Sequence, residues 1–172
     1  MKISLTKLFA QDGKSEKYEI PLTSEIFSIG GQDYRVIEKH PVILGLTHEG
    51  NRVITITGSA DLTMEIPCAR CLTPVATPFQ LEFDLQIDLN LSEEEREKKE
   101  EDSSFVEGDE LDVEELVRNE LIVQWPIRVL CKDDCKGICS RCGANLNIQT
   151  CDCDTTGLDP PNGCNQRYIQ QI

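Results

Sequence analysis

Aromatic residues, histidine and long hydrophobic runs are all scarce in this sequence. Only 5% of the 172 residues are aromatic, and two are histidine. No stretch approaches the roughly 20 consecutive apolar residues that a membrane-spanning helix needs, and residues 1–9 lack the uncharged core of a secretory signal. We therefore expect a cytoplasmic protein with no membrane partner. A chain of this length still buries about 70% of its unfolded surface, which is enough for a folded core.

The motifs of common enzyme classes are missing as well. The sequence has no glycine-rich phosphate loop, no HExxH pair and no Ser, His and Asp in a hydrolase order. Its two histidines, His40 and His48, occur in segments with a strand pattern and at no ligand spacing. We therefore predict that the protein is not an enzyme, and we assign no catalytic residue.

Positive charge is scarce in one segment in particular. The chain carries 17 Lys and Arg against 31 Asp and Glu, a net charge of −14. Residues 82–120 contain 4 basic and 17 acidic side chains and so account for −13 of that total. The densest part, residues 93–102, is typical of a solvated helix or a mobile loop, because like charges at this density repel one another. The alternative is an acidic tether for basic ribosomal or nucleic-acid-binding proteins.

Alternation of apolar and polar residues dominates the first 90 positions. This period of two indicates strands with one buried face. The expected strands span 2–5, 18–20, 34–37, 41–46, 52–58, 62–66 and 79–87. Gly50 and Asn51 supply the positive φ that a tight turn needs between two of them. The prediction for residues 1–90 is an antiparallel β-sheet or partly open barrel.

Residues 91–111 are acidic, and we assign them to a linker or an exposed helix. A pattern of helical periodicity follows them. Asp112 and Glu115 have the spacing of a capping box, and Pro126 ends the pattern. Four apolar residues recur on one helical face: Val113, Leu116, Val117 and Leu121. Residues 112–126 are therefore expected to form an amphipathic helix that packs on the β domain and completes it. The predicted fold class is α+β.

Cysteine is abundant where large apolar residues are few. Seven of the nine cysteines lie in residues 127–172, which we assign to a cysteine-rich metal-binding module and tail. Reducing conditions inside cells exclude a disulfide framework, and this segment has too few core-forming residues to fix its own shape. A bound metal would do so, because in small cysteine-rich modules the free energy of metal binding is folding free energy.

Eight of the cysteines form four close pairs. The pairs are Cys68 and Cys71, Cys131 and Cys135, Cys139 and Cys142, and Cys151 and Cys153. The simplest partition gives two four-thiolate sites, one from the first two pairs and one from the last two, so that the knuckle at 68–71 pins the module to the sheet. A single site of Cys135, Cys139, Cys142 and Cys153 also satisfies the spacing. Cys164 is left without a role.

Four thiolates with no open position are typical of structural zinc. Thiolate sulfur also suits iron, so an electron carrier is an alternative. The pair at 68–71 has the C-x-x-C spacing of redox-active thiols, but such pairs are expected where a strand opens into a helix. Neither neighbour of this pair has a helical pattern. Zinc, in two structural sites or in one, is the predicted cofactor.

Three motifs together resemble one known family. They are Cys68-Ala69-Arg70-Cys71-Leu72, the helix segment 111–121 and the cysteine-containing run 130–147. In combination they are similar to the YceD family of bacteria and plastids, from about residue 30 to residue 153. The resemblance implies a role in accumulation or processing of 23S ribosomal RNA, and thereby in assembly of the large ribosomal subunit. The implied partner is the pre-ribosomal large subunit.

Basic residues near the cysteines are the candidates for RNA contact. They are Arg70, Arg128, Lys132, Lys136 and Arg141. A free-standing RNA binder usually presents a basic face, and the acidic segment of this chain opposes RNA. Attachment to 23S ribosomal RNA through a ribosomal protein is therefore an alternative to direct contact.

Overall fold

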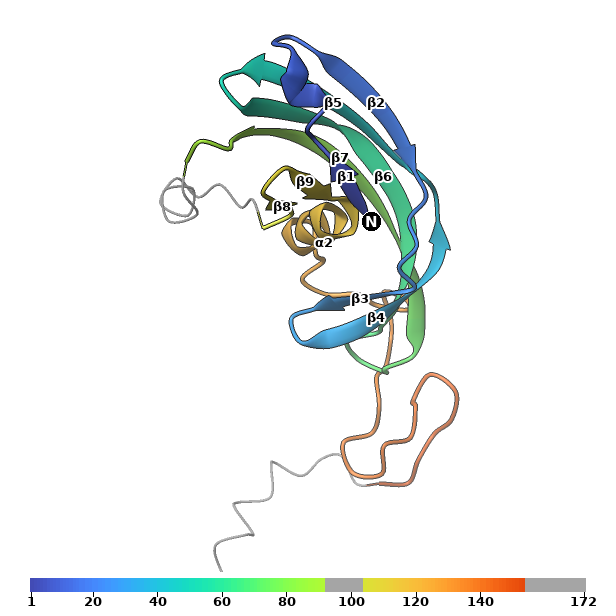
Figure 1. Ribbon diagram of the computed structural model, residues 1–172. Coiled ribbons are helices and arrows are strands. Elements are labelled where there is room, and N and C mark those ends of the chain that lie inside the picture. Colours follow the sequence, from blue (N-terminus) through green and yellow to red (C-terminus); the bar gives the residue numbers. More distant parts are fainter. Residues whose placement is uncertain (92–103, 154–172) are drawn as a thin grey trace, which may run out of the picture.

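The computed structural model describes residues 1–91 and 104–153 of the chain (Figure 1). The elements in chain order are β1 (Lys2–Ser4), the 3-10 turn η1 (Leu8–Ala10), β2 (Ser15–Ile20), β3 (Ile26–Ile29), β4 (Gln32–Lys39), β5 (Val42–Gly50), β6 (Val53–Pro67), β7 (Pro74–Asp88), β8 (Val106–Glu107), β9 (Glu110–Asp112) and α2 (Val113–Val123). Within the two described ranges, no helix is long and apolar enough to cross a membrane.

The main sheet is antiparallel and strongly curved (Figure 1). β6 is its central strand, and β7 pairs with one edge of β6 along the full length of both strands. Along the other edge of β6, β5 and β4 lie end to end, with β2 paired to β5 and β3 paired to β4. In the described part of the chain, neither β2 nor β3 pairs with β7. The predicted antiparallel sheet is confirmed, and this sheet is not closed into a barrel.

Two predicted strands, 52–58 and 62–66, are one continuous strand, β6. The residues between them mark the place where the partner of β6 changes from β5 to β4. Gly58 is required there, because a Cβ atom at this position would lie 2.0 Å from the carbonyl oxygen of Ile43 on β5. The glycine permits close approach of two backbones inside a strand and does not end the strand.

A second layer occupies the concave side of the sheet. β1, β9 and β8 form a small antiparallel sheet in that order, and α2 follows directly from β9. Figure 1 shows α2 inside the curve of the large sheet. The four apolar residues predicted to share one helical face are all buried. They join a single hydrophobic core with residues such as Leu44, Ile56 and Leu81 of the large sheet.

The start of α2 differs from the predicted capping box in one respect. Asp112 Oδ1 accepts hydrogen bonds from the N–H groups of Glu114 and Glu115, at 3.1 and 3.4 Å. The Glu115 carboxylate does not accept a hydrogen bond from the Asp112 N–H, as it would in a capping box, because it pairs with the Arg118 guanidinium. The Asp112 N–H instead donates to the carbonyl of Phe105 at 2.7 Å. The cap is therefore a one-sided Asp cap.

The linker or exposed helix predicted for 91–111 is wrong at its carboxy-terminal end. Residues 106–107 and 110–111 lie in β8 and β9, where Leu111 is paired with both Ile3 and Val106. Leu111 is fully buried and Val106 is 9% exposed. These strands are too short for their alternation to be seen among the acidic residues around them. The acidic run 93–102 lies outside the described residues.

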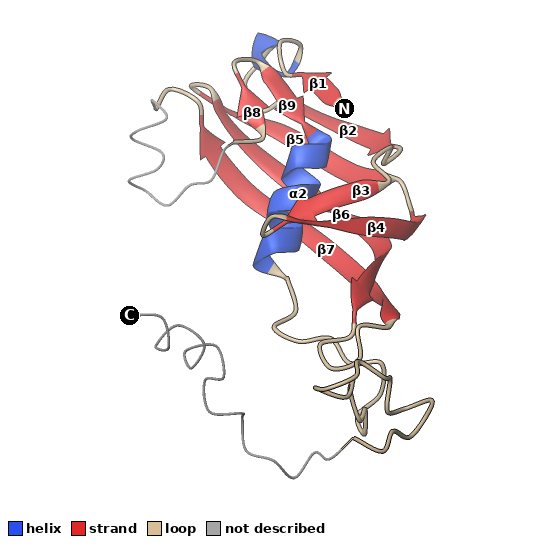
Figure 2. Ribbon diagram, turned by 90° about the horizontal axis from the view of Figure 1, so that it is seen from below, coloured by secondary structure: helices blue, strands red, loops and turns tan. Residues whose placement is uncertain are grey.

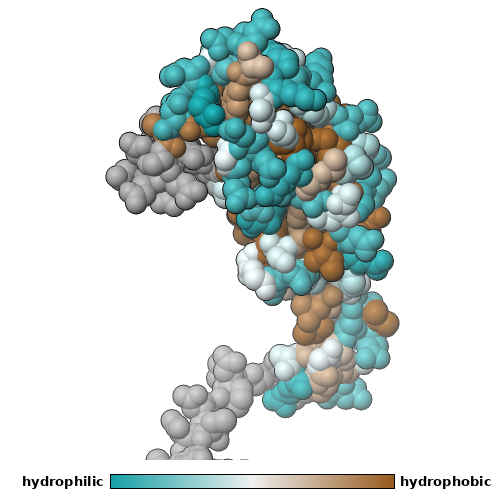
Figure 3. All heavy atoms as spheres, in the orientation of Figure 1, coloured by the Kyte–Doolittle hydropathy of each residue, from teal (hydrophilic) through white to brown (hydrophobic). Residues whose placement is uncertain are grey.

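Residues 124–153 continue past one end of the sheet as loops and turns (Figure 2). Trp125 anchors their start, because its ring stacks on Phe79 with centroids 5.6 Å apart and lies 4.6 Å from the ring centroid of Tyr34. The face seen in Figure 3 is largely hydrophilic, and hydrophobic residues gather on it where this segment joins the sheet. We call residues 124–153 the cysteine module. Its first residues pack on the folded β domain.

Candidate metal centre

Four thiols from two distant segments meet at the end of the β6–β7 hairpin. Cys68 and Cys71 lie in the turn between the two strands, and Cys131 and Cys135 come from the cysteine module. The Sγ atoms of Cys68 and Cys135 are 3.8 Å apart, and those of Cys71 and Cys131 are 3.5 Å apart. Thiolates about 2.3 Å from a tetrahedral zinc ion lie about 3.8 Å from one another. These separations therefore fit one shared ion.

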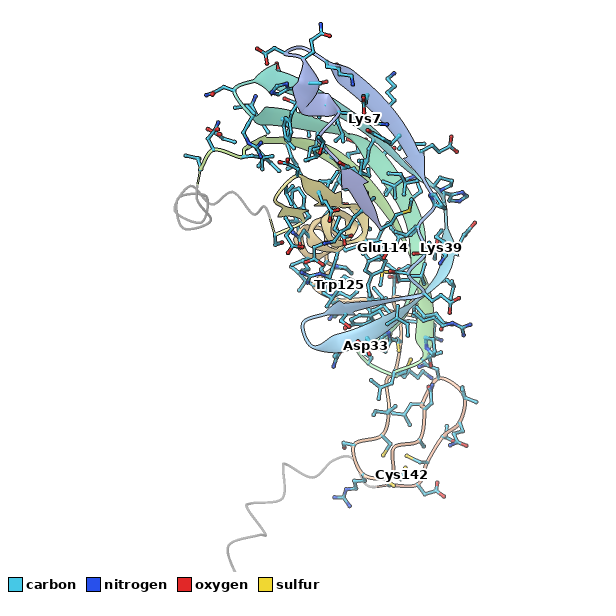
Figure 4. The ribbon with its side chains drawn as sticks, viewed as in Figure 1. Lys7, Asp33, Lys39, Glu114, Trp125 and Cys142 are labelled. Carbon is cyan, nitrogen blue, oxygen red and sulfur yellow. The ribbon has the colours of Figure 1, made fainter. Side chains whose placement is uncertain are left out.

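The other four cysteines form a second group within the cysteine module. They are Cys139, Cys142, Cys151 and Cys153, and their Sγ atoms lie within 4.8 Å of one another, as do those of the first group. Figure 4 places Cys142 at the end of the module that is remote from the sheet. The structure thus brings the eight thiols together as two groups of four. It places Cys135 in the first group, and Cys164 lies outside the described residues.

The two C-x-R-C turns are built with the same backbone hydrogen bonds. The Leu72 N–H donates to the carbonyl of Cys68, and the Gly143 N–H donates to the carbonyl of Cys139, both at 2.9 Å. The N–H groups of Cys68 and Cys139 donate across the turn to the carbonyls of Thr73 and Ala144, at 2.9 and 2.8 Å. Leu72 and Gly143 both have positive φ, at 60° and 72°. The chain therefore forms the same knuckle twice.

These turns direct amide groups at the sulfurs. Burial acts to raise the pKa of Cys68, but the backbone amides of Arg70, Cys71 and Cys131 outweigh it and lower that pKa to about 6. The amides of Cys142 and Arg141 likewise lower the pKa of Cys139 to about 6. Amide N–H groups stabilise the thiolate, which is the form that binds metal.

The remaining thiols resist ionisation while their neighbours carry charge. Burial, followed by the hydrogen bonds with Cys71 and Cys135, raises the pKa of Cys131 to about 12. In the second group, the contact with Cys142 and then burial raise the pKa of Cys153 to about 12. Four thiolates this close need a cation to offset their mutual repulsion, and a divalent metal ion supplies that charge. The donor set therefore fits a metal in both groups.

Side chains around the first group tie the two segments together. Arg70 Nη1 donates to the carbonyl of Cys135 at 2.8 Å, and Asn147 Nδ2 donates to Cys135 Sγ at 3.3 Å. The Thr73 hydroxyl, 3.3 Å from Cys71 Sγ, lowers the pKa of that thiol. Thr73 and Asn147 were not predicted as site residues, because no spacing rule marks the polar groups that surround a thiolate.

The five candidate RNA-contact residues are all exposed and lie on or beside the cysteine module. Arg70 is already bonded to Cys135, and Lys132 Nζ lies 3.6 Å from the Asp134 carboxylate. Within the described ranges no ion pair involves the other three, which are Arg128, Lys136 and Arg141. Both histidines lie apart from the thiols: His40 is 3.7 Å from Glu38, and His48 Nδ1 is 3.1 Å from the carbonyl of Gln11.

An open antiparallel sheet with one helix in its curve and two four-cysteine groups at one end defines a small β protein with candidate metal sites of structural type. The sequence matches the family described as large ribosomal RNA subunit accumulation protein YceD over residues 56–162. The chain belongs to this family. The matched range contains both knuckles, α2 and all eight clustered cysteines.

Similar proteins occur in a plant and in mycobacteria. Large ribosomal RNA subunit accumulation protein YCED homolog 1, chloroplastic, of Arabidopsis thaliana is 37% identical over 54 residues, which are 31% of this chain and 17% of that protein. An uncharacterized protein of Mycobacterium tuberculosis (strain H37Rv) is 22% identical over 147 residues, or 73% of this chain and 71% of its own length. An uncharacterized protein of Mycobacterium leprae is 24% identical over 110 residues, or 63% and 51%. No solved structure matches the chain.

Proposed function

We propose that this protein is a non-enzymatic ribosome-biogenesis factor that supports accumulation or processing of 23S ribosomal RNA in the large subunit. The observation that carries the proposal is the family match over residues 56–162, which coincides with the two knuckles and the cysteine module. Family membership supports the process, and the thiol geometry supports a scaffold. Each group consists of four cysteines, whereas catalytic zinc usually has His or carboxylate ligands and one open position.

In this proposal both thiol groups hold zinc. Cys68, Cys71, Cys131 and Cys135 would bind one ion and join the cysteine module to the β6–β7 hairpin. Cys139, Cys142, Cys151 and Cys153 would bind the other and fold the far end of the module. The ions would supply positive charge and fixed geometry, and the chain would supply the surface that meets the pre-ribosome.

The cations of the cysteine module are the proposed contacts to 23S ribosomal RNA. Arg128, Lys136 and Arg141 are exposed and have no ion-pair partner in the described ranges, which is what a phosphate contact requires. Residues 82–120 carry 17 acidic and 4 basic side chains, and this charge favours a ribosomal protein as an additional point of attachment.

Depletion in cells tests the proposed process. Loss of the protein is expected to lower mature 23S ribosomal RNA and the large-subunit peak in a sucrose gradient, without a matching loss of small subunits. Wild-type protein should restore both, and a variant with Arg128, Lys136 and Arg141 changed to Ala should restore them only in part. Unchanged RNA levels and subunit profiles after depletion would contradict the proposal.

A thiol-based electron carrier is the second candidate, favoured by two four-sulfur groups that suit iron as well as zinc. Metal analysis of purified protein separates the two candidates. Colourless protein with about two zinc ions per chain is expected for the scaffold. Stoichiometric iron with a visible charge-transfer band would support electron transfer instead.

A further inference from the structure

The outer edge of β7 offers a row of unpaired backbone groups. β7 has 15 residues and pairs only with β6 in the described part of the chain. The Cys68 N–H bonds to the carbonyl of Thr73, so these two residues are a hydrogen-bonded pair of the antiparallel ladder. Bonded and non-bonded pairs alternate along such a ladder. The odd-numbered residues of β7 therefore bond to β6, and the even-numbered residues turn their N–H and C=O groups outward.

The proline positions agree with this alternation and limit the usable edge. Pro74 and Pro78 are even-numbered and lie opposite Pro67 and Thr63, where a missing N–H costs no bond to β6. Beyond Pro78 no proline interrupts the strand. Five outward amides follow Pro78, and the last of them, at Asp88, lies at the very end of the strand. The other four are at Gln80, Glu82, Asp84 and Gln86, and none of them is hydrogen-bonded within the described part of the chain.

The convex face along this edge carries charge of one sign. β6 and β7 contain no Lys or Arg. Glu82 and Asp84 are exposed on the edge strand, and the exposed Asp61 of β6 faces Gln80 across the ladder. An open groove of about 320 Å³ lies beside them, with Glu38, His40, Asp61 and Gln80 among its lining residues. Cations are the charge that this face complements.

We propose that the edge of β7 from Gln80 to Gln86 binds an extended, basic segment of a partner protein by strand addition. The partner's backbone would pair with the four outward amides and their carbonyls, as in other strand-addition complexes. Its alternate side chains would be basic and lie beside Glu82 and Asp84 on the convex face. This site is separate from the thiol groups and goes beyond the proposed role with RNA.

Two other occupants fit the edge less well. A second copy of this chain would place Glu82 and Asp84 next to the same residues of the other copy, and like charges directly opposite one another destabilise a sheet. RNA would bring phosphates to a face without cations and would leave the outward amides and carbonyls without a strand partner. A basic protein segment satisfies both the backbone and the charge.

A labelled peptide that alternates Lys and Val tests the proposal on the full-length, metal-loaded protein. Glu82→Pro removes an outward N–H and spares every bond to β6, so it should weaken peptide binding at least about tenfold. Ala76→Pro is the matched control, because it removes an outward N–H of the same strand outside the proposed segment, and it should leave the affinity unchanged. Equal effects of the two substitutions would overturn the proposal.

A charge reversal keeps the test decisive if the proline variant does not fold. The double substitution Glu82→Lys and Asp84→Lys should weaken binding of the Lys-Val peptide and allow the protein to bind a Glu-Val peptide. Amide exchange measured by NMR should show new protection at Gln80, Glu82, Asp84 and Gln86 when the basic peptide binds. Unaltered exchange at these amides, an unchanged charge preference, or equal binding of a Lys-Val peptide with a central proline would each overturn strand addition. If a single-stranded RNA oligonucleotide bound the wild-type protein and its affinity were lost in the Glu82→Pro variant, the choice of a protein partner would be overturned.

Discussion

Cys71 Sγ lies 3.5 Å from Cys131 Sγ, although 60 positions separate the two residues in the chain. This contact and that of Cys68 with Cys135 join the cysteine module to the turn of the β6–β7 hairpin, in addition to the stacking of Trp125 on Phe79. The second thiol group involves only residues of the module. The two groups therefore have different tasks in the fold: one attaches the module and the other shapes it.

Substitutions in the two groups should have separable effects. Cys71→Ser is expected to lower the bound metal from about two ions to one and to expose backbone amides at the β6–β7 turn, because it removes a ligand from the attaching group. Cys142→Ser should also lower the metal content by one and leave that turn protected. Metal analysis with hydrogen exchange by mass spectrometry measures both, and Cys164→Ser, outside both groups, is the control. Loss of both metals from either variant would contradict two independent sites.

Removal of metal should unfold the cysteine module and leave the sheet folded. The sheet has its own core of buried residues around Leu44, Ile56 and Leu81, whereas the module depends on its ligands. After EDTA treatment we expect far-ultraviolet circular dichroism of the sheet to persist while residues 127–153 lose amide protection. Adding zinc should restore that protection. Cooperative unfolding of the whole chain by EDTA would show instead that the sheet depends on the metal.

Sequence patterns predicted those parts of the fold that repeat over several residues. β7 alternates buried and exposed side chains through Phe79, Leu81 and Phe83, and α2 buries four residues at helical spacing, so both were foreseen. β8 and β9 have two and three residues, too few to show a period. The sequence pattern predicts two strands at 52–58 and 62–66, whereas β6 continues through Gly58, which permits a close backbone approach to β5.

The cysteine pairs were visible in the sequence for a different reason. Thiolates that share one ion on a tight turn must be close along the chain, so spacing alone suggested the two groups of four. The polar contacts of Arg70 and Asn147 with Cys135 join distant segments and follow no spacing rule. The outward edge of β7 was likewise not predictable, because it depends on which strand pairs with β7 and in which register.

Leu72 is the one residue at which the two knuckles differ in backbone strain. It has a φ of 60°, whereas the equivalent position in the second knuckle is Gly143. Left-handed backbone costs a non-glycine residue roughly 1–2 kcal/mol, and glycine loses about 0.5–1 kcal/mol through unfolded-state entropy. Leu72→Gly is therefore expected to stabilise the metal-loaded protein by about 0.5–1 kcal/mol.

Urea unfolding monitored by fluorescence of Trp125, the only tryptophan, measures this change. Leu72→Ala is the matched control, because it removes the same exposed side chain and keeps the strained φ. A higher unfolding midpoint for both variants would attribute the gain to the lost leucine side chain instead of the backbone.

Glu114 connects α2 to the junction between β2 and β3. Its Oε1 atom accepts hydrogen bonds from the N–H groups of Thr23 and Ser24, at 3.1 and 3.0 Å, and Figure 4 shows Glu114 close to Lys39, whose Nζ donates to the carbonyls of the same two residues. Burial acts to raise the pKa of Glu114, but these hydrogen bonds outweigh it and lower the pKa from 4.5 to about 2. The folded state therefore binds this proton more weakly than the unfolded state.

The depressed pKa fixes the sign of the pH dependence. Glu114 contributes stability that is fully present above pH 4.5 and is lost as the pH falls toward 2. Glu114→Gln should therefore lower the free energy of unfolding by about 1–2 kcal/mol at pH 7, after allowance for solvent screening, and by much less near pH 2. Glu120→Gln is the matched control, since Glu120 lies on the same helix and, among the described residues, its side chain accepts a hydrogen bond from Gln124 alone, at 3.0 Å. Denaturant unfolding of the three proteins between pH 2 and 7 measures the difference, and a constant gap between Glu114→Gln and wild type across that range would show that the carboxylate charge is not what holds the junction.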